Sequence, residues 1–157
     1  MDIMASVLPV MPLMDDCAFP YILSVEDSPI DFEIIMRSFK KTGFEAPVHH
    51  CENGDSALDF LLAQKAKGRA ACLPTIVLLD LNLPGTDGRE VLRTIKSDDV
   101  LKSIPVVILS TSNNDNDVEY CLSHGADKYF MKPISPDNFV HTIHEIKILW
   151  DQMISHS

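Results

Sequence analysis

Charged and hydroxyl side chains come directly after four separate apolar runs of this sequence. Glu26 and Asp27 follow the first run, Asp80 the second, Ser110 ends the third, and Lys132 follows the fourth. Three carboxylates that meet at one place repel one another unless a cation lies among them. Oxygen ligands without histidine or cysteine favour a hard ion such as Mg²⁺ or Mn²⁺. The same residues could carry phosphoryl chemistry, in which a carboxylate attacks phosphorus while the metal, a lysine and a hydroxyl stabilise the phosphoryl oxygens.

The elements that would bring these residues together follow from the hydrophobic pattern. Strands are expected at residues 21–25, 46–51, 75–79, 104–110 and 128–131, and a segment of helical periodicity follows each. Nearly all-apolar strands that alternate with helices predict an α/β fold, a doubly wound parallel sheet with helices on both faces. With the strand order 2-1-3-4-5, Glu26, Asp27 and Asp80 converge at the carboxyl edge, where such sheets bind ligands.

Start and stop residues mark the first expected helix. Ser28 is its predicted N-cap, Pro29 its first residue and Asp31 the capping-box partner, and the helix ends at Gly43. This helix therefore begins beside the Glu26-Asp27 pair.

The bulk composition restricts the class of protein. The 157 residues, 46% of them hydrophobic, are enough for the core of one ordinary domain. The formal net charge of -10, with lysines and arginines scattered along the chain, disfavours direct binding to nucleic acid or to an anionic membrane. The four cysteines show no C-x-x-C spacing, so we expect neither a zinc site nor a disulfide framework, and a cytoplasmic location fits best.

Residues 1–20 precede the first expected strand and contain an apolar stretch at positions 3–14. This stretch is shorter than a membrane span, follows no lysine or arginine, and contains Pro9 and Pro12, which would break a helix. It predicts neither a signal peptide nor a transmembrane segment. We interpret residues 1–20 as an arm that is flexible or bound to a partner.

Four motifs occur in a fixed order along the chain. They are "VED" at residues 25–27, "LLDLNLPGTDG" at 78–88, "ILSTS" at 108–112 and "YFMKP" at 129–133. Together they resemble the receiver domain of two-component response regulators, a flavodoxin-like fold, over residues 21–150. Residues 151–157 would extend the last helix. The sequence is similar in particular to the stand-alone regulators that accompany bacterial phytochromes.

The resemblance implies a role for each acidic residue. Asp80 occupies the position of the phosphoacceptor, and Glu26 and Asp27 occupy those of the residues that hold Mg²⁺ or Mn²⁺, Asp27 more directly. The backbone carbonyl of Asn82 would bind the same ion.

The resemblance also implies a phosphorylation-dependent switch. Ser110 is the hydroxyl residue that would move towards the phosphoryl group, and Tyr129 the aromatic residue whose rotamer would follow that movement. Lys132 would contact the phosphoryl oxygens, and the Lys132–Pro133 peptide bond is expected to be cis. Thr111 is bulkier than the usual residue at its position, which affects the expected amplitude of the switch and the rate of dephosphorylation.

A single-domain response regulator is the function that the resemblance implies. Such a protein takes a phosphoryl group from a sensor histidine kinase, here a bacterial phytochrome, catalyses its own phosphotransfer and slow autodephosphorylation, and does not turn over small molecules. Two alternatives remain open. An Mg²⁺-dependent aspartyl phosphohydrolase normally has a second aspartate where Asn82 stands, and a flavin-binding module would need a Ser/Thr/Gly-rich loop where this chain has "EDSPID".

Two other groups of residues have simpler interpretations than a role in the site. Asp115 and Asp117 could be extra metal ligands but are explained by a polar loop that caps the next helix. The six histidines are interpreted as surface residues away from the acidic edge. They are His49, His50, His124, His141, His144 and His156. The phosphohistidine is therefore expected on the partner kinase.

The last expected helix begins at Ser135-Pro136 and runs past Trp150. Apolar residues recur along it at spacings of three and four, at Phe139, Ile143, Ile146, Trp150 and Met153. Because Trp150 and Ile154 come after the part of the helix that the sheet would cover, we predict a homodimer. Its contact would use the last two helices and the fifth strand, or this extension. Packing within the core is the alternative.

Overall fold

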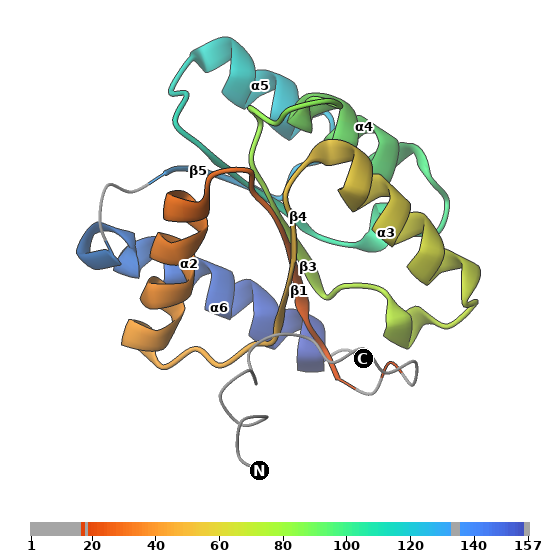
Figure 1. Ribbon diagram of the computed structural model, residues 1–157, viewed down its shortest axis with the longest axis horizontal. Coiled ribbons are helices and arrows are strands. Elements are labelled where there is room, and N and C mark those ends of the chain that lie inside the picture. The colour runs from red at the N-terminus through yellow and green to blue at the C-terminus, as the bar shows by residue number, and fades with distance from the viewer. Residues whose placement is uncertain (1–16, 18, 133–135, 156–157) are drawn as a thin grey trace.

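A parallel sheet lies between two layers of helices in the computed structural model, which describes residues 17, 19–132 and 136–155 (Figure 1). The strands of these residues are β1 (Ile22–Val25), β2 (Val48–Cys51), β3 (Ile76–Leu79), β4 (Val106–Ser110) and β5 (Lys128–Met131). Their order is β2-β1-β3-β4-β5, and every neighbouring pair is parallel. The predicted doubly wound, flavodoxin-like fold is confirmed.

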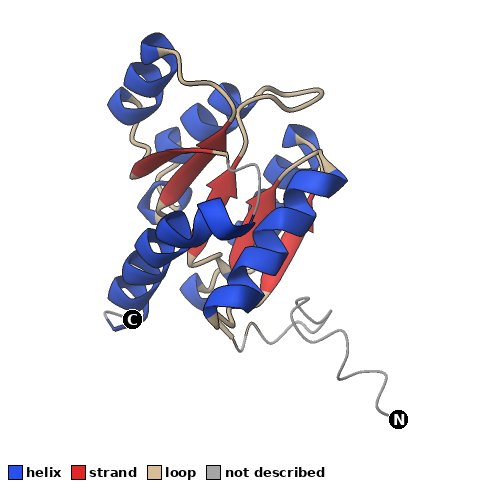
Figure 2. Ribbon diagram, turned by 90° about the vertical axis from the view of Figure 1, so that its left-hand side faces the viewer, coloured by secondary structure: helices blue, strands red, loops and turns tan. Residues whose placement is uncertain are grey.

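The helices divide between the two faces of the sheet. They are α2 (Pro29–Thr42), α3 (Gly54–Ala66), α4 (Gly88–Ser97), α5 (Asp115–Ser123) and α6 (Val140–Ser155), with 3-10 helices at Ala70–Cys72, Leu101–Ser103 and Pro136–Phe139. α2 and α6 cover one face, and α3, α4 and α5 cover the other (Figure 1). Figure 2 shows the same layers from the side, with strands in red between helices in blue. Among the described residues, no helix combines the length and the apolar character needed to cross a membrane.

Prolines explain why two strands begin later than predicted. β2 begins at Val48 and β4 at Val106, each directly after a proline. Pro47 and Pro105 have no N–H to donate to the sheet. Their carbonyl oxygens still accept hydrogen bonds of 2.9 Å from the neighbouring strands, so both prolines lie at the rim of the sheet.

The core consists of two clusters, one on each face of the sheet. Leu23 and Val77 contribute to the cluster under α3, α4 and α5, whereas Ile22 and Ile76 contribute to the cluster under α2 and α6. All four side chains are fully buried. Because both faces are covered, successive strand residues are apolar rather than alternating with polar ones. This is the reason for the continuous apolar runs in the sequence.

The start of α2 follows the predicted capping pattern only in part. The hydroxyl oxygen of Ser28 accepts a hydrogen bond of 3.2 Å from the Asp31 N–H, and Gly43 ends the helix with a positive φ of 74°. The carboxylate of Asp31 does not complete the capping box. It contacts Lys132 instead, 2.8 Å away.

The end of α6 packs more tightly than expected. Trp150 lies edge-on against Phe44 with 5.7 Å between the ring centroids, and it is half-buried. The expectation that Trp150 extends beyond the cover of the fold was therefore wrong, because the loop after α2 reaches it. The predicted helix start also differs: a 3-10 turn precedes Val140, and Ser135 lies outside the described residues. The homodimer remains a prediction.

A disulfide bond links Cys17 to Cys72, across 55 positions of the sequence. The expectation of no disulfide was wrong. The spacing of the cysteines carries no signal for this pair. Cys17 precedes β1 and Cys72 precedes β3, and only the pairing of these two strands brings the cysteines together. Cys51 and Cys121 are free and buried.

Candidate functional site

Three carboxylates converge at the carboxyl edge of the sheet. β1 and β3 pair in register from Ile22 with Ile76 to Val25 with Leu79, so the residues that follow them are neighbours. One carboxylate oxygen from each of Glu26, Asp27 and Asp80 lies within 4.8 Å of the other two. Glu26 and Asp80 are 2% and 4% exposed, and Asp27 is exposed. This donor set, made of oxygen alone and open to solvent on one side, fits a hard divalent cation.

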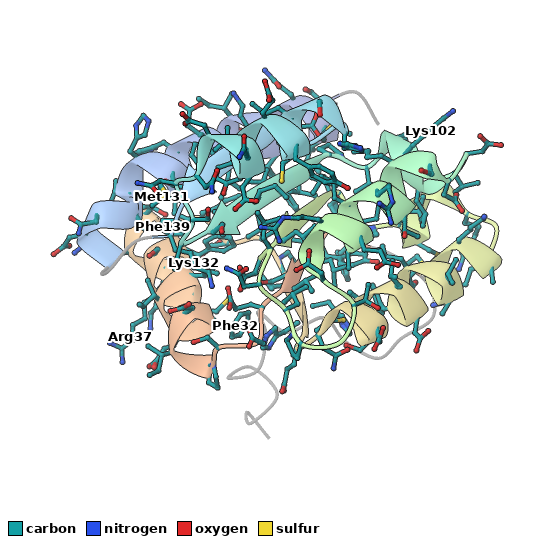
Figure 3. The ribbon with its side chains drawn as sticks, turned by 90° about the horizontal axis from the view of Figure 1, so that it is seen from above. Phe32, Arg37, Lys102, Met131, Lys132 and Phe139 are labelled. Carbon is teal, nitrogen blue, oxygen red and sulfur yellow. A yellow bond between two sulfur atoms is a disulfide. The ribbon has the colours of Figure 1, made fainter. Side chains whose placement is uncertain are left out.

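Lys132 compensates much of this negative charge. Its ammonium nitrogen lies 2.8 Å from Asp31, 2.9 Å from Glu26 and 3.0 Å from Asp80, measured to a carboxylate oxygen of each. Figure 3 looks down on this edge and labels Lys132. Burial opposes the charge of the ammonium group, but hydrogen bonds to Asp31 and Glu26 outweigh it and raise the pKa of Lys132 above its ordinary value. Lys132 is therefore a permanent cation of the site.

Asp31 belongs to this site although its sequence position suggested only a helix cap. It stands in the first turn of α2, which begins immediately after Glu26 and Asp27 and so lies over the same edge. Its distance of 2.8 Å to the Lys132 ammonium nitrogen is as short as that of Glu26. The available signal was weak: an acidic residue near a helix start is common, and its partner is 101 positions away.

Glu26 is the residue of the site whose protonation is most perturbed. Burial of its carboxyl group, reinforced by the charge of Asp80 and opposed by the hydrogen bond with Lys132, raises its pKa to about 7. The Ser28 N–H donates to the same carboxylate over 3.2 Å. A substantial fraction of Glu26 is thus protonated near neutral pH, and a divalent cation would displace that proton.

One histidine lies beside the acidic edge, contrary to expectation. The Nε2 atom of His50 is 2.8 Å from the backbone carbonyl oxygen of Glu26, and its ring stacks on Phe32 with 3.8 Å between centroids. The neighbouring His49 is half-buried against Phe60. The expectation that His50 lies away from the acidic edge was wrong, because β2 pairs with β1 and so brings His50 beside Glu26.

The loop after β3 folds back against Asp80. The Gly88 N–H donates to the Leu81 carbonyl oxygen over 2.9 Å, and a Cβ at position 88 would lie 2.2 Å from the Asp80 carbonyl oxygen. Only glycine fits this close approach. The Asn82 N–H donates to the Asp80 carboxylate over 3.2 Å. The predicted metal-binding role of the Asn82 carbonyl remains a prediction.

The two predicted switch residues contact the same residue of the loop after β4. Ser110 is buried, and its hydroxyl oxygen accepts from the Ser112 N–H over 3.1 Å. The Tyr129 hydroxyl donates to the Ser112 carbonyl oxygen over 2.9 Å. Ser112 therefore links the two residues, whose role as a switch remains a prediction. The predicted cis bond between Lys132 and Pro133 lies outside the described residues.

Asp117 holds this loop rather than adding to the acidic cluster. Its carboxylate accepts from the Ser112 hydroxyl over 2.7 Å and pairs with Arg89 over 2.7 Å. The hydrogen bond from Arg89, with that from Ser112, lowers the pKa of Asp117. Asn114 is the N-cap of α5, and Asp115 is the first residue of that helix.

A comparison with known protein families accounts for both the fold and the four motifs. The family model of the response regulator receiver domain matches residues 22–144. The chain belongs to this family. The order of the strands and the placement of the four motifs at the carboxyl edge of the receiver domain agree with that assignment.

Relatives of this receiver domain include stand-alone phytochrome-associated regulators. It is 42% identical to the "Probable methanogenesis regulatory protein FilR2" of Methanothrix harundinacea over 129 residues, 82% of either chain. It is 34% identical to the response regulator Rcp1 of Synechocystis over 134 residues, 85% of this chain and 90% of Rcp1.

Two solved structures of such regulators resemble the fold. The phosphorylated cyanobacterial phytochrome response regulator RcpA superimposes with a TM-score of 0.73 at 34% identity, over 85% of this chain and 94% of RcpA. The Mn²⁺-bound form of Rcp1 superimposes with a TM-score of 0.71 at 34% identity, over 83% of this chain and 94% of Rcp1. The predicted resemblance to stand-alone phytochrome-associated regulators is confirmed.

Proposed function

We propose that this receiver domain takes a phosphoryl group from the phosphohistidine of a sensor kinase onto Asp80. The convergence of Glu26, Asp27 and Asp80 with Lys132 at one edge of the sheet is the observation that carries the proposal. The three carboxylates and the Asn82 carbonyl would hold Mg²⁺ or Mn²⁺. When bound, the ion supplies positive charge for the phosphoryl oxygens.

Asp80, Lys132 and Ser110 have separate roles in the proposed reaction. A carboxylate oxygen of Asp80 attacks phosphorus, and the bond between phosphorus and the kinase histidine breaks with its electron pair going to nitrogen. Lys132 already donates to Asp80 over 3.0 Å, so its ammonium group stands where the equatorial oxygens arrive. The Ser110 hydroxyl can donate to another of these oxygens while its oxygen still accepts from the Ser112 N–H.

The consequence of phosphorylation would be a change of surface around α5 and β5. Movement of Ser110 displaces Ser112, which carries the hydrogen bond of Tyr129, a residue of β5. The partners that we propose are a sensor histidine kinase, a phytochrome on the precedent of RcpA, and a second copy of the chain. Such a kinase partner implies a cytoplasmic location.

Labelling with a small phosphodonor tests this function. The chain is incubated with acetyl phosphate and Mg²⁺, and its intact mass is followed with time. We expect the gain of one phosphoryl group, its loss in Asp80→Asn, and no gain in EDTA. Asp87→Asn is the matched control, because Asp87 lies in the same loop but pairs with Arg89.

Two outcomes would count against the proposal. Labelling of Asp80→Asn at the wild-type rate would remove Asp80 from the role of phosphoacceptor. Repeated turnover of a small phosphate ester would instead support the phosphohydrolase alternative.

A further inference from the structure

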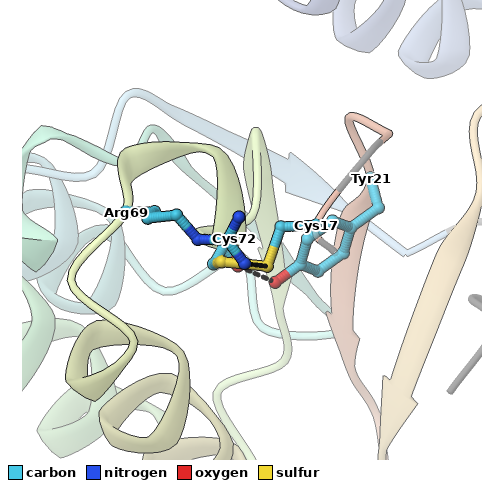
Figure 4. Close-up of a disulfide and its surroundings, with 4 residues drawn as sticks. All are labelled: Cys17, Tyr21, Arg69 and Cys72. Carbon is cyan, nitrogen blue, oxygen red and sulfur yellow. Dashed lines mark hydrogen bonds between the residues drawn. A yellow bond between two sulfur atoms is a disulfide. The ribbon is translucent and has the colours of Figure 1, made fainter. Parts of the chain in front are cut away.

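Figure 4 shows the Cys17–Cys72 disulfide beside Tyr21. Because both cysteines precede strands of the parallel sheet, the bond lies at the amino edge, opposite the acidic cluster. Cys17 shortly precedes β1, and Cys72 shortly precedes β3. These are the neighbouring strands whose carboxyl ends carry Glu26 and Asp80. The bond thus joins the two strands of the acidic site at their other ends.

The two strands do not depend on this bond for their alignment. The Thr75 N–H donates to the Tyr21 carbonyl oxygen over 2.8 Å, and the buried Tyr21 hydroxyl donates to the Cys72 carbonyl oxygen over 2.7 Å (Figure 4). These contacts involve no sulfur, so opening of the bond removes none of them directly. What the disulfide adds is a covalent restraint on Cys17, in the segment that precedes β1.

That segment borders an apolar groove. Cys17 and Phe19 line it together with Leu73, Ile104 and Met153. Phe19 is 58% exposed at its rim. Cys17 is 7% exposed and lines the groove, whereas Cys72 is 1% exposed, so a small thiol would approach the pair through the groove, at Cys17.

Cys17 and Cys51 are equally buried, each 7% exposed, so a neighbouring cation rather than exposure distinguishes Cys17 from the free cysteines. A guanidinium nitrogen of Arg69 lies 3.7 Å from the Cys17 sulfur (Figure 4), and a cation beside a sulfur stabilises the thiolate, the reactive form. Burial raises the pKa of the thiols of Cys51 and Cys121 to about 11. Thiol chemistry should therefore be selective for Cys17 and its partner.

We propose that Cys17 and Cys72 form a reversible redox site that exchanges with low-molecular-weight thiols and disulfides. In the closing direction, the Cys17 thiolate attacks one sulfur of a small disulfide, breaks its S–S bond and releases one small thiolate. The Cys72 thiolate then attacks the Cys17 sulfur of this mixed disulfide and releases the second small thiolate. The two protein thiols are oxidised by two electrons, the small disulfide is reduced to two thiols, and the protons pass to the thiolates released.

This site would act independently of phosphorylation. The acidic cluster is at the far end of β1 and β3, and neither the pairing of these strands nor the hydrogen bond from Tyr21 involves sulfur. Redox state would control the segment before β1 and the groove beside it. On the proposed function the chain works in the cytoplasm, where disulfides of this kind form transiently and report redox state.

Equilibration of the whole, native chain in glutathione buffers tests the proposal. Samples at graded ratios of oxidised to reduced glutathione are quenched in acid, alkylated and analysed by peptide mass spectrometry. We expect Cys17 and Cys72 to pass together from alkylated thiols to a disulfide at intermediate ratios. Cys51 and Cys121 should react only after denaturation. Acetyl phosphate labelling of Asp80 should be equal in both redox states.

Substitution of Arg69 distinguishes a reactive pair from a structural one. Arg69→Gln should slow bond formation about three- to tenfold near neutral pH and move its pH–rate profile to higher pH, whereas Arg69→Lys keeps the profile. A bond that stays closed in excess reduced glutathione until the chain unfolds would overturn the proposal. So would two thiols that are alkylated independently and never form the bond.

Discussion

Replacement of Glu26 by glutamine should stabilise the metal-free receiver domain at alkaline pH. The substitution keeps the shape of the side chain and an oxygen that can accept from Lys132 and Ser28, but it removes a charge that is 2% exposed. In the wild-type chain, burial and the charge of Asp80 disfavour that charge. Glutamine imitates the protonated form, so the size of the effect depends on pH.

The magnitude follows from the shift of the Glu26 pKa from 4.5 to about 7. A raised pKa in the folded state means that folding favours the protonated carboxyl group. Its contribution to stability is complete below about pH 4.5 and is lost as the pH rises through about 7. At about 1.4 kcal/mol for each unit, the loss reaches up to about 3 kcal/mol near pH 8 and is under about 1 kcal/mol near pH 5. Glu26→Gln should recover these amounts.

Urea denaturation in EDTA near pH 5 and near pH 8 measures the effect as a change in the free energy of unfolding. Glu52→Gln is the control, because Glu52 is an exposed carboxylate that follows β2 at the same edge. Its effect should stay within about 0.5 kcal/mol at both pH values. Saturating Mg²⁺ should reverse the order at pH 8, since the ion stabilises ionised Glu26. An equal effect of Glu26→Gln at both pH values, or destabilisation at pH 8, would refute the reasoning.

Two further predictions concern Lys132 and Gly88. Lys132→Ala should destabilise the metal-free protein by about 3 kcal/mol at pH 8, because it leaves buried carboxylates unpaired, and should abolish any phosphorylation-dependent change in mass measured by light scattering. An unaltered oligomeric response to acetyl phosphate would remove Lys132 from the switch. Gly88→Ala should lower the free energy of unfolding, measured by thermal denaturation, by about 3 kcal/mol or more, because its Cβ would lie 2.2 Å from the Asp80 carbonyl oxygen. Gly68→Ala is the control: no atom lies within 4 Å of its Cβ, so the loss should be about 1 kcal/mol. Equal costs at the two glycines would contradict the close contact.

The sequence alone was sufficient for the type and order of the elements. Apolar runs of strand length, the Ser28 cap and the Gly43 stop are local signals, because they reflect backbone hydrogen bonding and periodic burial within a few residues. The placement of Glu26 and Asp80 at strand ends is local in the same sense. Once a parallel sheet with β1 beside β3 is assumed, their meeting follows from the geometry of the sheet.

Local sequence patterns did not predict the contacts between distant segments of the chain. Asp31 has the sequence position of a helix cap, yet its carboxylate binds Lys132 because α2 lies over the edge where β5 ends. His50 reaches the Glu26 carbonyl only because β2 pairs with β1. In each case the partner is set by which elements become neighbours, and many pairings are compatible with the same local pattern.

The cysteines show most clearly the difference between what the sequence determines and what the tertiary structure determines. Their spacing along the chain is uninformative, so the sequence by itself excluded a C-x-x-C motif but did not show which cysteines pair. Tertiary structure decided that Cys17 and Cys72 meet, because the pairing of β1 with β3 aligns the segments that precede both strands. Local sequence determines how each segment folds, whereas the long-range packing of the sheet determines which side chains come close enough to react.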